Sequence, residues 1–153
     1  MRLIHCSEER HAEAILDIFN HAILNSTALY DYKPREPSSM QGRLLGFASY
    51  GPFRDRPANK YSVEHSVYVH HECRGMGLGK RLLGDLIELA IERDVHVMVG
   101  GIDLANQASI ALHERLGFEP AGVIREAAYK FGRWLDLAFY QKILETPLQP
   151  VEG

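Results

Sequence analysis

The segment RGMGLGK, residues 74–80, places glycine at three alternate positions directly before a run with helical periodicity. Glycine at such a point either supplies positive φ for a turn or lets another group approach the main chain closely. One glycine is enough for an ordinary strand-to-helix turn. Free backbone N–H groups at a helix N-terminus attract anions, and Arg74, Lys80 and Arg81 add positive charge. The segment therefore predicts an anion-binding loop, with a purely structural turn as the alternative.

Two familiar phosphate-binding motifs do not fit this segment. A Walker A loop would need glycine where the chain has Arg74, and Ser or Thr where it has Arg81. A dinucleotide-binding fingerprint would need its third glycine at Lys80. What remains is the general mechanism, in which the start of a helix binds an anion.

The composition indicates one globular domain, residues 1–153, of ordinary apolar content. A net charge of −3 argues against a nucleic-acid partner, which needs a basic surface. No apolar run approaches the length of a membrane span, and the first residues do not resemble a secretory leader. Two cysteines argue against a disulfide framework. We therefore expect a cytoplasmic protein that does not bind membranes.

Hydrophobic periodicity predicts alternating strands and helices along the whole chain. The order of these elements predicts an α/β or α+β fold around a sheet of mixed direction. We expect helices at about 8–24, 77–93 and 106–117, and strands at 1–6, 43–50, 62–71 and 95–102, followed by two strands that flank a turn at Gly132.

Strand 62–71 has the clearest alternation in the chain. Because successive side chains of a strand point to opposite faces, Glu64 and Tyr68 share one face, and His65 and Val67 share the other. The glycine segment follows this strand directly. A ligand anchored at the glycines and lying along the strand would reach Glu64, about 16 Å of extended chain before Val69.

The glycine segment fits the R/Q-x-x-G-x-G/A pyrophosphate loop of the GNAT superfamily of acetyl-CoA-dependent N-acetyltransferases. NQASIALHERLGF, residues 106–118, resembles the second acyl-CoA segment of that superfamily. The chain is more closely similar to the phosphinothricin and methionine sulfone/sulfoximine acetyltransferases. That resemblance is carried by STALYDYKPRE, GFASYGPFRDRP, VEHSVYVH, GGIDLANQASIALHERLGF and KFGRWLDLAFYQ, in this order.

The resemblance implies a GNAT-type sheet, mixed but mostly antiparallel and flanked by helices. It also implies that acetyl-CoA binds where two parallel strands splay apart. It assigns binding of this co-substrate to Val67, Tyr68, Val69, Arg74, Gly75, Met76, Gly77, Leu78, Gly79, Lys80, Asn106 and Ser109.

An amine must lose a proton before it can attack a thioester, and Glu64 is the expected base, acting directly or through water. The alternative for Glu64 is a half-exposed strand carboxylate. Main-chain N–H groups around Val67 are expected to stabilise the oxyanion. His113 is the candidate that protonates the departing thiolate, with helix packing or a CoA contact as the alternative. Asn106 is expected to bind the pantetheine arm, to cap the helix, or both.

Other features of the sequence are weaker. Arg54, Lys60 and Tyr61 lie on a loop that could meet an acceptor carboxylate, or that is simply solvated. No metal site is expected from the histidines of strand 62–71. The family would place about twenty more residues near positions 39–42. The resemblance leaves open whether the protein has lost this piece or the printed sequence omits it. By analogy with the family, the chain is expected to be a homodimer.

The sequence thus predicts direct transfer of acetyl from acetyl-CoA to the amine of a small amino-acid-like acceptor. Phosphinothricin, methionine sulfone and methionine sulfoximine are the candidates implied by the resemblance. Two alternatives are a non-catalytic acyl-CoA sensor and a peptide or protein N-acetyltransferase. A sensor would need the glycine segment and Asn106, but neither Glu64 nor His113.

Overall fold

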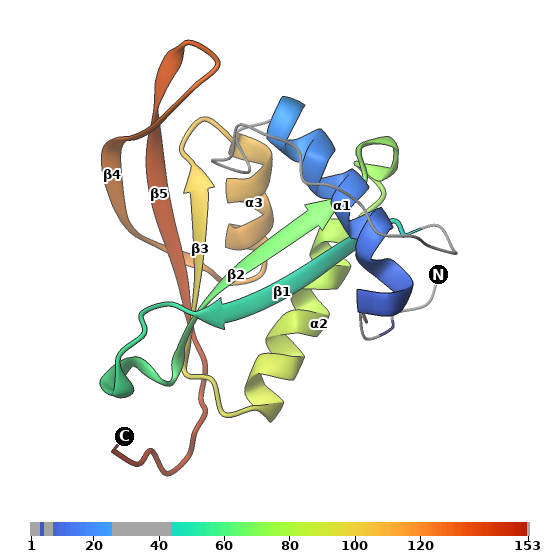
Figure 1. The fold of residues 1–153 in the computed structure, drawn as a ribbon. Coiled ribbons are helices and arrows are strands. Elements are labelled where there is room, and N and C mark those ends of the chain that lie inside the picture. The colour runs from blue at the N-terminus through green and yellow to red at the C-terminus, as the bar shows by residue number, and fades with distance from the viewer. Residues whose placement is uncertain (1–3, 5–7, 26–43, 153) are drawn as a thin grey trace.

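The computed structural model describes residues 4, 8–25 and 44–152. The described part contains three α-helices and five strands around a single sheet (Figure 1). The helices are α1 (Glu8–Asn25), α2 (Leu78–Glu92) and α3 (Gln107–Arg115). The strands are β1 (Gly46–Pro52), β2 (Ser62–Val69), β3 (Val97–Asp103), β4 (Glu119–Lys130) and β5 (Arg133–Ile143). Short 3-10 helices span Pro57–Asn59 and His71–Cys73.

The sheet has the strand order β1-β2-β3-β5-β4. Strands β2 and β3 are parallel, whereas the other three neighbouring pairs are antiparallel. This arrangement confirms the expected mixed, mostly antiparallel sheet. Figure 1 shows β2 and β3 diverging from a common vertex, with α3 behind the gap between them.

Helices cover both faces of the sheet. Helix α1 packs Ile18 and Ala22 against Phe47 of β1 and Tyr68 of β2. On the opposite face, α2 and α3 close the main core. This core includes Val63, Leu83, Leu86, Ala90, Met98, Ile102, Ile110 and Phe118.

Helix α2 follows directly from the spacing of its apolar residues. Leu83, Leu86 and Ala90 recur at intervals of three and four, so one face of the helix is buried against the sheet. Leu83 is fully buried, and removing such a side chain from water stabilises a fold by about 1.5–3 kcal/mol. The helix begins immediately after Gly77, one residue from the predicted start.

Strand β1 runs further than the sequence predicts. The expected strand ends at residue 50, but β1 continues through Gly51 to Pro52. Among the described strands β1 is an edge strand, where proline is tolerated. Conversely, β2 ends at Val69 rather than at His71, because His71 begins a 3-10 turn. The other boundaries differ by a few residues, as is usual at frayed ends.

Strands β4 and β5 form a long hairpin whose turn lies at the predicted glycine. Phe131 and Gly132 both have positive φ, and Lys130 pairs with Arg133 across them. Two positive φ values are the geometry of a tight turn that matches the twist of the flanking strands. The strand expected at 1–6, apart from residue 4, and the short join at 39–42 lie outside the described residues. No helix in the described ranges is long and apolar enough to cross a membrane.

Candidate active site

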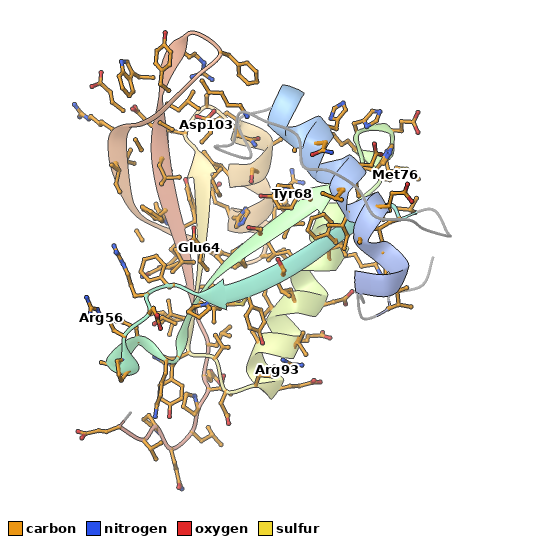
Figure 2. The ribbon with its side chains drawn as sticks, viewed as in Figure 1. Arg56, Glu64, Tyr68, Met76, Arg93 and Asp103 are labelled. Atoms are coloured by element: carbon orange, nitrogen blue, oxygen red, sulfur yellow. The ribbon has the colours of Figure 1, made fainter. Side chains whose placement is uncertain are left out.

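The cleft lies where β2 and β3 separate. Their parallel pairing stops at His65 and Gly100, and beyond that point β2 runs on to Val69 without β3 beside it. The cleft encloses about 320 Å³. In Figure 2, Glu64 lies near the vertex, Tyr68 lies further along β2, and Asp103 lies at the far end of β3. The lining residues include Glu64, His65, Ser66, Val67, Tyr68, Gly100, Gly101, Asp103, Asn106, Ser109 and His113.

The backbone of β2 offers hydrogen bonds to this cleft. The N–H of His70 donates to the carbonyl of Leu45, so even-numbered residues of β2 direct their backbone groups toward β1. The carbonyl of Tyr61 accepts from β3, so odd-numbered residues face β3. Val67 and Val69 are odd-numbered and lie beyond the end of the parallel pairing, so their N–H and C=O groups face the opening. An extended ligand could therefore bond there as an added strand does.

The three glycines of the loop have two different structural roles. Gly75 and Gly77 have φ of 78° and 77°, a backbone conformation that residues with a side chain rarely adopt. A Cβ on either would meet open space. A Cβ on Gly79, by contrast, would lie 3.2 Å from a methyl carbon of Leu112 on α3. Gly75 and Gly77 thus shape an open loop before α2, and Gly79 lets α2 and α3 pack closely.

The loop leaves the start of α2 available to an anion. The first backbone hydrogen bond of the helix runs from the N–H of Arg81 to the carbonyl of Gly77. The N–H groups of the first helical residues have no acceptor within the helix and carry its positive dipole end. Arg74, Met76 and Lys80 are exposed around this point, which lies at the upper end of β2 in Figure 2.

Glu64 is exposed and lies close to β3. A Cβ on Gly101 would be 3.2 Å from Glu64 Oε1, so the absence of a side chain at Gly101 makes room for the carboxylate. The Glu64 side chain lies on the same face as Gly101 and Leu137, opposite to the face that α2 and α3 cover. The carboxylate is therefore at the cleft wall and open to water, as a base acting on an incoming amine requires.

His113 and His65 form a buried pair on the other side of the vertex. The two Nε2 atoms are 2.9 Å apart, and His113 Nδ1 is 2.7 Å from the carbonyl oxygen of Ser109. Both residues are 5% exposed. A Cβ on Gly100 would lie 2.9 Å from His113 Nε2 and 3.0 Å from His65 Cε1, so glycine is needed there. Sequence reasoning identified His113 but missed His65 and Gly100.

Burial favours the neutral form of both imidazoles. Desolvation, followed by repulsion from His113, lowers the pKa of His65 to about 3. Desolvation also lowers the pKa of His113, against a hydrogen bond to Ser109. A carbonyl only accepts, so Nδ1 of His113 carries the proton and its Nε2 is an acceptor. His65 Nε2–H is therefore the donor in the pair.

The N-terminus of α3 forms the remaining wall of the cleft. Asn106 caps the helix by accepting a hydrogen bond from Ser109 N–H through Oδ1 at 3.1 Å. The predicted cap is thus confirmed. Because the oxygen is used in this way, the amide NH₂ is the group that Asn106 can offer to a bound molecule. Asn106 and Ser109 both line the cleft, as a binding role needs.

Comparison with known proteins gives the class of this site. The acetyltransferase (GNAT) family profile matches residues 7–118. The chain belongs to the GNAT family of acetyltransferases. It is an enzyme, an acetyl-CoA-dependent N-acetyltransferase.

Named relatives support the assignment of this GNAT enzyme. An L-methionine sulfoximine/L-methionine sulfone acetyltransferase of Pseudomonas aeruginosa is 42% identical over 151 residues, with 86% of this chain and 88% of the relative covered. The structure of a putative acetyltransferase from Acinetobacter baylyi is 50% identical, with a TM-score of 0.94 and coverage of 99% and 96%. A Sinorhizobium meliloti phosphinothricin acetyltransferase in complex with acetyl-CoA is 34% identical, with a TM-score of 0.82 and coverage of 92% and 88%.

An ion pair between buried Asp103 and exposed Arg133 supports the α3 wall of the GNAT cleft, and sequence reasoning did not identify it. Asp103 is buried at the end of β3 and accepts a hydrogen bond from Ala105 N–H at 3.1 Å. Its other carboxylate oxygen lies 3.5 Å from Arg133 Nη2 on β5. Asp103 therefore fixes the turn that leads into Asn106 and ties it to the hairpin.

The loop residues that were expected to meet an acceptor make other contacts within the described structure. Lys60 Nζ donates to the carbonyl of Glu152, and the Tyr61 hydroxyl accepts from Val151 N–H. Arg54 lies over the ring of Phe53. The described lining of the cleft does not include Arg54, Lys60 or Tyr61. Their contact with an acceptor stays a prediction.

The remaining histidines at the end of β2 pack against one another. The rings of His70 and His71 stack at 4.4 Å, and His71 stacks on His21 of α1 at 4.0 Å. His70 also lies 3.4 Å from Asp17. Within the described ranges, no group of three or more His, Cys, Asp or Glu residues is arranged to hold a metal ion.

We expect the free energy of unfolding of the enzyme to decrease as pH is lowered, because of His65. The pKa of His65 is about 3 in the folded chain and about 6.5 when unfolded, so between these values only the unfolded chain binds this proton. The free energy of unfolding therefore decreases by about 1.4 kcal/mol per pH unit below 6.5. His113 contributes in the same direction. Urea unfolding at pH 7, 6 and 5 measures this dependence.

The matched variant for that measurement is His65→Gln, which has no titrating group. Between pH 6 and pH 5 the free energy of unfolding of this variant should decrease less steeply. The difference in slope should correspond to about one proton fewer taken up on unfolding. Carboxylates contribute equally to both proteins, so the difference between the two slopes isolates His65. Identical slopes would show that His65 titrates normally in the folded chain.

Proposed function

We propose that this enzyme transfers acetyl from acetyl-CoA to the α-amine of a small amino-acid-like acceptor, such as L-methionine sulfone, L-methionine sulfoximine or phosphinothricin. The observation that carries the proposal is the position of Glu64 near the vertex of the cleft, next to the part of β2 that runs on beyond its described pairing with β3. The names of the Pseudomonas and Sinorhizobium relatives support this class of acceptor. Residues Cys6 and Cys73 are too few for a disulfide framework, which supports action in the cytoplasm.

The residues of the cleft fit acetyl-CoA from one end to the other. The loop 74–80 would hold the pyrophosphate on the free N–H groups at the start of α2, with Arg74 and Lys80 beside it. The backbone groups of Val67 and Val69 would bond to the amides of the pantetheine arm. Asn106 would donate to the same arm from α3. When bound, acetyl-CoA supplies the acetyl group as a thioester.

Glu64 would start the reaction by taking a proton from the acceptor ammonium, directly or through water. The freed amine nitrogen then bonds to the acetyl carbon, and the bond from that carbon to sulfur breaks. The nitrogen gives up its second proton, which leaves a neutral amide. The N–H of Val67 would donate to the acetyl oxygen as negative charge develops on it. The thiolate finally needs a proton. His113 is the predicted donor. Because its Nδ1–H is directed to Ser109, the ring would have to take up a proton at Nε2 before it could protonate the thiolate.

The test is acceptor-dependent release of CoA thiol by the purified protein. The panel should contain L-methionine sulfone, L-methionine sulfoximine, phosphinothricin, the common amino acids and short peptides. We expect turnover with the sulfone, sulfoximine or phosphinothricin, and at least a hundredfold less with peptides. Turnover confined to peptides would contradict the proposal. Acetyl-CoA binding without release by any acceptor would favour a sensor.

We also infer that the protein is a homodimer that pairs through the β4–β5 hairpin. Strand β4 lies at an edge of the described sheet. Val123, Ile124, Tyr129 and Trp134 are each about half exposed on this hairpin. Apolar residues gathered on an edge strand are typical of an interface, because an uncovered edge of this kind invites aggregation.

Light scattering should therefore give about twice the chain mass of 17.3 kDa. Ile124→Lys should shift the protein toward monomer, because it would bury a charge in the interface. Leu148→Lys is the control, since Leu148 is 88% exposed and lies outside the hairpin. A chain that is already monomeric at 50 micromolar or so would refute the dimer.

We further infer that this chain lacks a family segment near positions 39–42. The alignment with the Pseudomonas relative runs over 151 positions although it takes in 86% of a 153-residue chain, so it contains positions at which this chain has no residue. The sequence motifs on both sides of the join resemble the family, which supports this location for the gap.

A further inference from the structure

The buried histidine pair connects the two walls of the cleft at its vertex. His65 belongs to β2 and His113 to α3, and their contact lies beside the last parallel pair of β2 and β3, His65 and Gly100. Ser109 belongs to the same helix and accepts the second hydrogen bond of His113. The pair thus fixes the distance between β2 and α3 where the strands begin to separate.

The hydrogen bonds of the pair run in one direction. His65 Nε2–H donates to His113 Nε2, and His113 Nδ1–H donates to the carbonyl of Ser109. Each imidazole has one N–H in its neutral form, and each N–H is used inside the protein. The remaining nitrogen, His65 Nδ1, is buried and makes no hydrogen bond of good geometry among the described residues, although the Val99 backbone acts on the ring and favours its protonated form.

If the two histidines served only to fill the core, burying their polar nitrogens would lower the stability of the fold. Two apolar side chains of similar volume would pack the vertex without a buried, unpaired nitrogen. The pair also requires glycine at position 100, which removes a side chain from the core face of β3. Costly polar contacts that border a cleft are typical of functional positions.

We propose that His65 is a positioning residue, which holds His113 and α3 at the separation from β2 that fits the acetyl-thioester arm of acetyl-CoA. This inference rests on the proposed function. In this role His65 touches neither the acceptor nor the reacting atoms. It orients the imidazole of His113 and, through the carbonyl of Ser109, the first turn of α3, where Asn106 lines the cleft. Loss of His65 should therefore weaken acetyl-CoA binding more than acceptor binding.

The test compares His65→Leu with His65→Gln. Leucine fills the volume but donates no hydrogen bond, whereas the glutamine amide nitrogen can take the place of Nε2–H. We expect His65→Leu to weaken acetyl-CoA binding, measured by calorimetry, at least tenfold, and His65→Gln to stay within threefold of the unaltered protein. His96→Gln is the control, because His96 is exposed and bonds Thr146 away from the cleft.

Steady-state kinetics with L-methionine sulfone give a second comparison. In His65→Leu the KM for acetyl-CoA should rise at least tenfold, and the KM for the sulfone should change less than threefold. Nε2 of His113 is also released in that variant, so its pH profile should gain an ionisation nearer 6.5 that His65→Gln lacks. Equal effects on both KM values, or a glutamine variant as impaired as the leucine variant, would overturn the proposal.

Nitrogen-15 NMR of the ring nitrogens separates this inference from the proposed function. We expect His65 as the neutral Nε2–H form and His113 as the neutral Nδ1–H form at pH 6. A different form of either ring, or a charged ring, would overturn the positioning role whatever the activity. If no acceptor supports turnover but the ring forms and the acetyl-CoA affinities are as expected, the acceptor assignment fails and the positioning role stands.

Discussion

Replacing Glu64 with glutamine should lower kcat at least a hundredfold at pH 7. The variant keeps the size and polarity of the side chain but cannot take a proton, and a positioned base contributes about 10²–10⁴-fold to such a step. Glu64 is exposed, so the change should leave the free energy of unfolding within about 0.5 kcal/mol. The KM for acetyl-CoA should change less than threefold. Glu64 lies at the vertex of the cleft, whereas the residues proposed to bind the pantetheine arm lie further along β2 and on α3.

The pH dependence of Glu64→Gln makes this result specific. Without a base, the reaction depends on acceptor that is already deprotonated in solution. The kcat/KM for the acceptor should therefore rise about tenfold per pH unit from pH 6 to pH 9, and the defect should shrink as pH rises. Glu88→Gln on the exposed face of α2 is the matched control and should keep full activity. A loss of less than tenfold in Glu64→Gln at pH 7 would remove Glu64 as the base.

Much of the cleft follows from local sequence. The glycine segment predicted a helix N-terminus shaped for an anion, and the positive φ of Gly75 and Gly77 agrees with that reading. The separate role of Gly79 did not follow, because its neighbour Leu112 belongs to another helix. Alternation along β2 correctly placed Glu64 and His65 on opposite faces. Periodicity is a local property, so it transfers from sequence to structure.

The features that the sequence did not predict all depend on distant contacts. His65 shares a face with Val63 and Val67, and a histidine among valines was a usable sign of a buried polar group. Its partner His113 comes 48 residues later, on an element whose placement no local pattern fixes. The pairing of Asp103 with Arg133 is missed for the same reason, since it joins β3 to β5. The resemblance predicted that β2 and β3 splay, and the register shows that they separate after His65.

The glycine opposite the histidine pair gives the second large effect. In Gly100→Ala the new Cβ would lie 2.9 Å from His113 Nε2, closer than Cβ atoms are found to such a neighbour, and 3.0 Å from His65 Cε1, which is tighter than most contacts. Both rings are buried and held by hydrogen bonds, so neither can swing into solvent to make room. We expect the substitution to destabilise the fold by about 1–3 kcal/mol, the usual cost of overfilling a packed core.

The loss of function in Gly100→Ala should exceed what instability alone causes. At 20 °C, where the variant remains folded, kcat/KM for acetyl-CoA should fall at least tenfold, because the displaced rings change the separation of β2 from α3. Gly84→Ala is the matched control. A Cβ there meets nothing within 4 Å, and alanine in a helix interior is favoured over glycine by about 1 kcal/mol, so that variant should be active and more stable. If Gly100→Ala unfolds at the same urea concentration as the unaltered protein and keeps its kcat/KM, the vertex is not packed as tightly as the distances between these atoms require.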